Sequence, residues 1–153
     1  MAQRKISKIA IIPVTFACLA LMLTAYAAVT VSTTINATGT MVYATPSNIG
    51  VYSDSACTVA LAPIDWGSLS PGGTVSKTFY VKNIAGVANL TLSMATSNWS
   101  PTTANGPITI TWNRQGTVLA PGRSTMATIT LSTSASITGI ASFGVQIIIS
   151  GTG

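Results

Sequence analysis

Few residues in this 153-residue chain could carry acid–base or metal chemistry. The chain has no histidine and no glutamate, and its only carboxylate side chains are Asp54 and Asp65. General acid–base catalysis draws mainly on histidine and on paired carboxylates. Serine and threonine make up roughly a quarter of the residues, well above ordinary usage, but a hydroxyl nucleophile needs an adjacent base. We therefore expect no enzyme, no cofactor and no metal site.

The two carboxylates and the three tryptophans are expected to have structural roles. Asp54 stands between two serines, which is typical of a side chain that hydrogen-bonds within its own turn. Asp65 precedes Trp66, and we expect it at a turn or strand end beside a core tryptophan. Tryptophans could stack on sugars, but we expect at least two of Trp66, Trp99 and Trp112 to fill the core.

The amino end combines a basic flank with a long apolar run over residues 9–29, the basic residues being Arg4, Lys5 and Lys8. This order is typical of a secretory signal peptide over residues 1–27, with a small-x-small cleavage site that ends at Ala27 and frees Ala28. The alternative is a retained anchor, since about 20 apolar residues cross a bilayer. Both predict an exported protein, secreted or on the cell surface, that meets the membrane only through this segment.

Cleavage after Ala27 would change the charge and the cysteine count. Four cationic and two anionic side chains would remain, a net charge of 4 − 2 = +2. No basic stripe for nucleic acid survives, so we expect no nucleic-acid partner. Cys57 would be the one cysteine left, either a small buried hydrophobe or an intermolecular bridge. With so few groups that bind protons, stability should depend little on pH.

Three Asn-x-Ser/Thr sequons are candidate glycosylation sites, and they begin at Asn36, Asn89 and Asn98. In an exported chain such asparagines could carry glycans. The sequence therefore indicates a glycoprotein, with glycans as further partners.

The exported part is predicted to be all-β. Apolar and polar residues alternate, as half-buried strands require, in the stretches 78–81, 90–94, 108–113, 128–131 and 143–150. Residues 97–107 hold the Asn, Pro and Gly signals of a loop, and Lys82-Asn83 is expected in a polar turn. Seven or eight strands at this spacing predict an immunoglobulin-like or jelly-roll β-sandwich over residues 46–153, preceded by an N-terminal apolar helix.

One internal echo is specific. Residues 69–74 and 78–81 match residues 119–124 and 128–131 at an offset of fifty. Each copy has a Pro-Gly pair, which predicts a type II turn that leads into a strand. We interpret the echo as two corners of one sandwich with the same turn chemistry, and not as a ligand site.

Residues 28–45 form a separate N-terminal strand in this prediction. It alternates over the residues Val29, Val31, Thr33 and Ile35, and residues 41–43 could continue it. It is either the first edge strand of its own sandwich or a donor strand for a neighbouring subunit. Strand addition supplies main-chain hydrogen bonds plus pockets for alternate side chains. Repeated head to tail, such contacts do not close and so make a filament.

The chain resembles a group of secreted β-sandwich proteins. Residues 64–73, then Lys77–Asn83 and Gly86, are similar to the "PG … (K)xFxVxNxG" pattern of the TasA/camelysin family of matrix fibre subunits and of archaeal surface proteins such as the bundling pili. Residues 98–101 and 110–113 resemble archaeal members. The resemblance implies a signal peptide, a sandwich or jelly-roll body, an N-terminal strand donated to the next subunit, and no catalysis.

The sequence thus predicts a structural subunit of an extracellular filament or pilus whose main partner is itself, as a homopolymer. One alternative is a subunit like a type IV pilin that retains its apolar helix. Another is a monomeric, membrane-tethered or secreted, immunoglobulin-like binding module. The first residue of the mature chain separates the three: Ala28 favours strand donation, a residue near Ile9 a pilin, and Met1 a tether.

Overall fold

The computed structural model describes residues 35–43, 48–86 and 88–153, which belong to one compact unit. The expected signal peptide and apolar helix lie outside the described residues. The described residues form nine strands and one short 3-10 helix: β1 (Ile35–Tyr43), β2 (Ile49–Tyr52), β3 (Ile64–Leu69), β4 (Thr74–Asn83), β5 (Leu90–Ser100), η1 (Thr102–Ala104), β6 (Ile108–Trp112), β7 (Val118–Leu119), β8 (Ser124–Thr133) and β9 (Ser142–Thr152). Within these ranges there is no helix of the length and hydropathy that a bilayer span needs.

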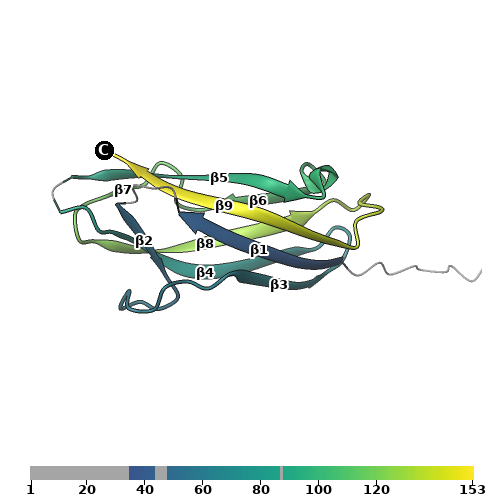
Figure 1. Cartoon of the computed structure of the whole chain (residues 1–153), viewed down its shortest axis with the longest axis horizontal. Coiled ribbons are helices and arrows are strands. Elements are labelled where there is room, and N and C mark those ends of the chain that lie inside the picture. The colour runs from purple at the N-terminus through teal and green to yellow at the C-terminus, as the bar shows by residue number, and fades with distance from the viewer. Residues whose placement is uncertain (1–34, 44–47, 87) are drawn as a thin grey trace, which may run out of the picture. The chain divides into compact units, whose positions relative to one another are not determined.

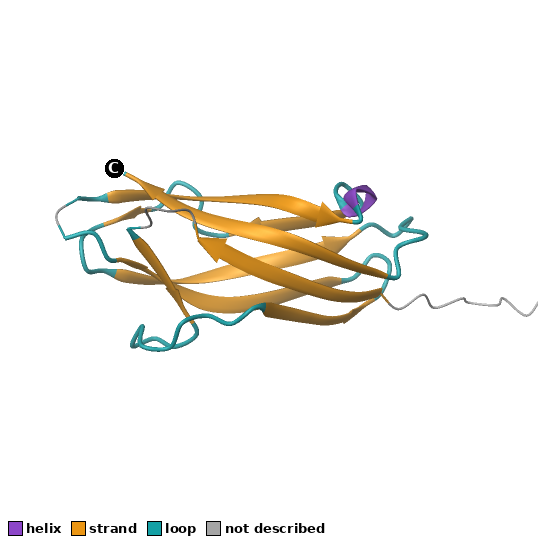
Figure 2. Ribbon diagram, in the orientation of Figure 1, coloured by secondary structure: helices purple, strands orange, loops and turns teal. Residues whose placement is uncertain are grey.

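The strands make two sheets (Figures 1 and 2). One has five strands in the order β3-β1-β9-β5-β7, and the other has four in the order β2-β4-β8-β6. Neighbouring strands run antiparallel, except that β1 is parallel to β9. The all-β sandwich predicted from the alternating stretches is confirmed at this level, with nine described strands in place of the expected seven or eight.

The inward faces of both sheets share one apolar core. In β9, Phe143, Val145, Ile147 and Ile149 are buried in strict alternation, as the sequence pattern predicted. Trp66 is buried in this core, and the ring of Trp99 stacks on Phe143 with 6.0 Å between ring centroids. Trp112, like Trp99, is partly buried against the same core, so the expectation that at least two tryptophans fill the core is confirmed fully for Trp66 and only in part for the other two.

Two local predictions were wrong, and two short strands were missed. Strand β5 continues to Ser100, through a bulge between Ser97 and Ser100, so residues 97–100 are not part of a loop. Asn83 does not lie in a polar turn but ends β4 with its side chain fully buried. Strands β2 and β7 were not predicted, because segments of four and two residues are too short to show a period.

Strands β2 to β9 form two halves related by an approximate two-fold arrangement. In the first half, β2 to β5, and in the second, β6 to β9, the first and third strands enter the four-stranded sheet and the others enter the five-stranded sheet. The four-stranded order β2-β4-β8-β6 is unchanged when the halves are exchanged. The register obeys the same symmetry. Thr74 pairs with Ser132, and their counterparts at an offset of fifty, Ser124 and Lys82, pair with each other. The sequence echo is therefore the trace of a structural repeat.

The two Pro-Gly corners have the geometry that the echo predicted. Gly72 and Gly122 have φ angles of 73° and 70°, a backbone region that glycine adopts without cost. The turn bond runs from the Gly73 N–H to Ser70 O (2.8 Å) in one corner. In the other it runs from the Arg123 N–H to Ala120 O (3.1 Å). The interpretation as two equivalent corners is confirmed.

Each corner is closed by the last residue of the other half's strand. The Thr133 N–H donates to Gly73 O and the Asn83 N–H donates to Arg123 O, both at 2.9 Å. Asn83 and Thr133 are also the buried polar residues of the described chain. The two halves are thus interlocked through backbone bonds at equivalent places.

Candidate functional site

Strand β1 breaks the two-fold arrangement of the body. Strand β7 pairs directly with β5, so symmetry would place its counterpart β3 directly beside β9. Instead β1 lies between β3 and β9, hydrogen-bonded to both. Among the described strands, β1 is the one without a counterpart in the other half. We call the space that it fills, bounded by the facing backbones of Ile64–Leu69 and of residues 142–149, the β1 slot.

Backbone pairing holds β1 in the slot along both sides. Its parallel register with β9 runs over eight residue pairs, from Asn36 opposite Ser142 to Tyr43 opposite Ile149. Its antiparallel register with β3 runs over five pairs, from Ile35 opposite Leu69 to Gly39 opposite Ile64. Figure 1 shows β1 and β9 running side by side in the same direction. Such ladders depend on extended backbone more than on particular side chains.

A bulge in β3 shapes the same slot. Gly67 pairs with Ala37 and Asp65 with Thr38, so Trp66 is an extra residue opposite β1. Gly67 has a φ of 70°, and its N–H donates to Asp65 Oδ1 at 2.8 Å. The indole Nε1 of Trp66 is a buried donor with no hydrogen-bond partner among the described residues. Asp65 thus lies beside a core tryptophan, as predicted, but it supports a bulge within β3 and not a turn.

The donor-strand residues proposed from the sequence are only partly described. Ile35 opens β1 and pairs with Leu69, whereas Val29, Val31 and Thr33 lie outside the described residues. The first alternative, an edge strand of its own sandwich, is wrong in one respect. β1 is internal to the sheet, because it pairs with β9 on one side and, up to Gly39, with β3 on the other.

The described sequon asparagines differ in setting. Asn89 and Asn98 are exposed, and Asn98 Nδ2 donates to Gln146 Oε1 at 2.8 Å. Asn36 belongs to β1, where it pairs with Ser68 on one side and Ser142 on the other. Asn89 and Asn98 are therefore accessible candidates for glycosylation.

The β2–β3 loop is organised by Asp54. Its carboxylate accepts the N–H groups of Thr58 (3.0 Å) and Val59 (2.8 Å) and the Thr58 hydroxyl (2.8 Å). The backbone bond from Val59, followed by those from Thr58, holds the pKa of Asp54 below its ordinary value. The predicted turn role of Asp54 is confirmed. Cys57, in the same loop, is half-buried with a φ of 55°, so its expected burial in the core is wrong.

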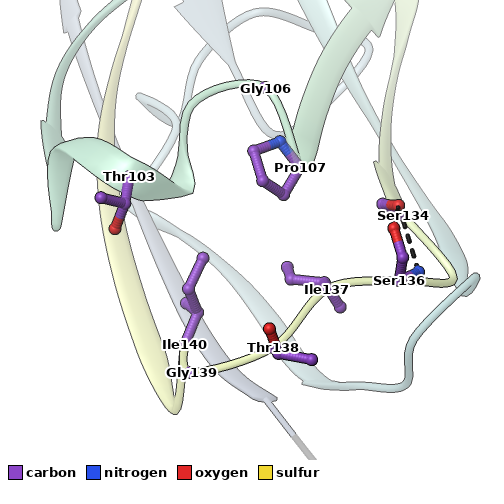
Figure 3. A pocket seen from close by; sticks show the side chains of 9 residues that line it. All are labelled: Thr103, Gly106, Pro107, Ser134, Ser136, Ile137, Thr138, Gly139 and Ile140. Atoms are coloured by element: carbon purple, nitrogen blue, oxygen red, sulfur yellow. Dashed lines mark hydrogen bonds between the residues drawn. The ribbon is translucent and has the colours of Figure 1, made fainter.

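The structure also has an open pocket at the end of the body where β9 begins. It has a volume of about 580 Å³ and lies between the segment that precedes β6 and the β8–β9 loop. Figure 3 shows the side chains of Ile137 and Ile140 in this pocket, with the Ser136 N–H bonded to Ser134 Oγ at 3.2 Å. Its lining contains no titratable side chain, so it offers no acid, base or charged ligand.

Nothing in the described chain gathers metal ligands, since no three His, Cys, Asp or Glu side chains lie close enough together to hold an ion. The chain matches no known protein family, no curated protein and no solved structure. The β1 slot is therefore the feature on which a functional conclusion has to be built.

Proposed function

We propose that this protein is the structural subunit of an extracellular filament, in which the N-terminal strand of one subunit fills the β1 slot of the next. The observation that carries the proposal is the position of β1, an added strand between β3 and β9 where the two-fold body has none. Because β1 has no counterpart in the two-fold repeat, it is the strand best suited to be donated to another subunit.

Exchange of β1 between subunits costs little in bonding. A strand from a second copy would make the same pairs with β3 and β9 that the chain makes with itself. Swapping of an identical element is a low-cost route to association. Residues 28–43, if extended, reach about 50 Å at roughly 3.3 Å per residue, which is enough to span a neighbouring sheet.

The direction of β1 favours an open chain of subunits. Because β1 and β9 are parallel, β1 begins beside Ser142 and ends beside Ile149, near the end of β9. The donating element and the accepting slot are different surfaces of the molecule, so one-way donation is a heterologous contact, whereas mutual exchange between two copies would close as a dimer. Heterologous contacts form filaments wherever the rotation between subunits does not close.

The surface chemistry supports the same proposal. After cleavage at Ala27 the chain would have a net charge of +2, and low net charge favours association. The resemblance of residues 64–83 to fibre subunits of the TasA/camelysin group and to the bundling pili points in the same direction. The exported chain would reach the cell surface or the medium, with exposed Asn89 and Asn98 available for glycans.

Electron microscopy and a cysteine cross-link test this proposal together. In a chain with Cys18 and Cys57 replaced by serine, Asn36→Cys and Ser68→Cys place two thiols at paired positions of β1 and β3. In filaments, donation links the thiols of different subunits, so a non-reducing denaturing gel should show a ladder. A matched control, Ser76→Cys with Thr130→Cys, joins β4 to β8, where the two hydroxyls lie 2.9 Å apart, and should give monomers only.

The opposite result is equally clear. Absence of filaments, or filaments whose Asn36→Cys/Ser68→Cys chains run only as monomers, would place β1 in its own sheet and refute strand donation. Sequencing of the mature N-terminus then separates the remaining functions. A start near Ile9 would indicate a subunit like a type IV pilin, and a start at Met1 a tethered binding module.

A further inference from the structure

In the two-fold arrangement, the side of β9 that pairs with β1 has a counterpart, which is the side of β5 that faces β7. Strands β5 and β9 are both eleven residues long and pair with each other antiparallel. The outer side of β9 faces β1, whereas the outer side of β5 faces β7, which pairs with Leu90 and Thr91 only. An uncovered strand edge is a template for pairing with another chain. The rest of β5 therefore needs another cover.

The β6–β7 loop supplies that cover. The Leu92 N–H donates to Thr117 O at 2.9 Å, and the Gly116 N–H donates to Leu92 O at 2.8 Å. The next outward donor, the Met94 N–H, bonds to the side-chain oxygen Oε1 of Gln115 at 3.0 Å. An amide side chain thus occupies the place that a carbonyl of an added strand would take.

Trp112 holds Gln115 in this position. The indole N–H of Trp112 donates to the same Oε1 atom at 2.9 Å, and the ring packs partly buried against the core. Gln115 itself is exposed, so burial does not fix its rotamer. The rotamer is held instead by the Met94 N–H and the Trp112 indole N–H, which both donate to Oε1 of Gln115.

The far end of β5 is irregular as well. The bulge between Ser97 and Ser100 has Asn98 at a φ of 51°. Ser97 Oγ and Asn98 Nδ2 both donate to Gln146 Oε1 at 2.8 Å. Bulges bend a strand and end its pairing, which is one way in which natural proteins protect an edge.

We propose that Gln115, positioned by Trp112, closes the β5 edge to extended chain from a second copy of this protein. Of the two long edges that flank the β9–β5 pair, only the β1 slot then accepts extended chain, and assembly through this pair is linear and unbranched. The linearity rests on the proposed function. The closure of the β5 edge does not, because an open β5 edge would associate even if β1 never left its own sheet.

The test uses the full exported chain with β1 locked in its own sheet. Oxidised Asn36→Cys/Ser68→Cys monomers, with the other cysteines replaced, cannot exchange β1, so any association reports other surfaces. Into this chain we would introduce Gln115→Ala, which removes the acceptor, and Gln115→Glu, which keeps one. Association is measured by sedimentation, and binding of a fluorescent peptide of residues 28–43 by anisotropy.

The expected result is that the Gln115→Ala chain self-associates or binds the peptide about tenfold more tightly than the locked parent, the factor that one hydrogen bond of about 1.4 kcal/mol represents. Gln115→Glu should behave as the parent. Trp112→Phe, which keeps an aromatic ring but lacks the indole N–H, should show a smaller increase. A folded Gln115→Ala chain that stays monomeric and binds no more peptide than the parent would overturn the proposal, whatever the filament test shows.

Discussion

The first half of the body, β2 to β5, and the second, β6 to β9, close their equivalent corners with different side chains. Asn83 Nδ2 donates to Ala88 O and Leu119 O, both at 2.8 Å, and its Oδ1 accepts the Ala85 N–H at 2.9 Å. At the equivalent place Thr133 Oγ1 lies 2.7 Å from Ser70 O and 3.2 Å from Gly73 O. The repeat thus constrains the backbone and the burial at these two places, whereas the donors that the nearby carbonyls need come from an amide in one half and a hydroxyl in the other.

The largest expected effect comes from the core residues that the repeat makes equivalent, Phe79 in β4 and Ile129 in β8. Both are fully buried. Truncation leaves a cavity, so we expect Phe79→Ala to lower the free energy of unfolding by about 3–5 kcal/mol and Ile129→Ala by about 2–5 kcal/mol. Urea denaturation measures both. A cost below about 1 kcal/mol at either position would mean that the two halves do not share one core.

The corners themselves come next. Asn83→Ala removes the side-chain partner of the buried Leu119 carbonyl and of the part-buried Ala88 carbonyl and Ala85 N–H, so we expect a loss of about 2–4 kcal/mol. Thr133→Val keeps the shape and removes one donor, and should cost about 1–2 kcal/mol. Ser76→Ala, in an exposed hydroxyl pair, is the matched control and should change stability by less than about 0.5 kcal/mol. A larger loss of stability for Thr133→Val than for Asn83→Ala would show that the number of side-chain hydrogen bonds does not determine how much each corner contributes.

Much of the body could be predicted from local patterns. The period-two alternation in β9 and the Pro-Gly pairs at residues 71–72 and 121–122 depend on neighbours along the chain, and both appeared as predicted. β7 is a strand only because it lies against β5, so its two residues carry no signal of their own. The burial of Asn83 depends on carbonyls that include Leu119 O, thirty-six residues away. Without knowledge of that contact, the polar pair Lys82-Asn83 was predicted to be a turn.

The sequence predicted that the candidate site contains an N-terminal strand, but not where that strand lies in the sheet. The alternation around Ile35 indicated a strand, and the fifty-residue echo indicated two like corners. Their combination, a two-fold body with one added strand, needs the order of strands across the sheet, which no local pattern contains. Gln115 had no sequence signal, because its role depends on the Met94 N–H from another strand.

A smaller effect is expected at the turn glycines, where the two corners should behave alike. Gly72 and Gly122 both have a φ near 70°, a region in which a Cβ costs about 1–2 kcal/mol. A Cβ at Gly72 would lie 3.6 Å from the Cβ of Ala135, and one at Gly122 would meet nothing within 4 Å. Gly72→Ala and Gly122→Ala should therefore lower stability by similar amounts, measured by thermal unfolding. A difference above about 1 kcal/mol would show that the corners are not equivalent.

The smallest expected effect is a difference between the two halves in how their loop stability depends on pH. The β2–β3 loop of the first half relies on the Asp54 carboxylate, whereas the β6–β7 loop of the second relies on amides, with Asn113 Oδ1 accepting the Thr128 N–H at 2.9 Å. The folded-state pKa of Asp54 is lowered, first by the Val59 backbone bond. Its stabilisation is therefore complete above the unfolded pKa of about 3.9 and is lost as the pH falls through the folded value.

We accordingly expect the melting temperature to be level from pH 7 to pH 5 and to decrease only slightly below pH 4. Asp54→Asn should remove that decrease, because an asparagine does not titrate, while Asn113→Ala should lower the melting temperature equally at every pH. Scanning calorimetry of the three chains between pH 2 and pH 7 measures this. A decrease below pH 4 that is as large in the Asp54→Asn chain as in the parent would contradict the expectation.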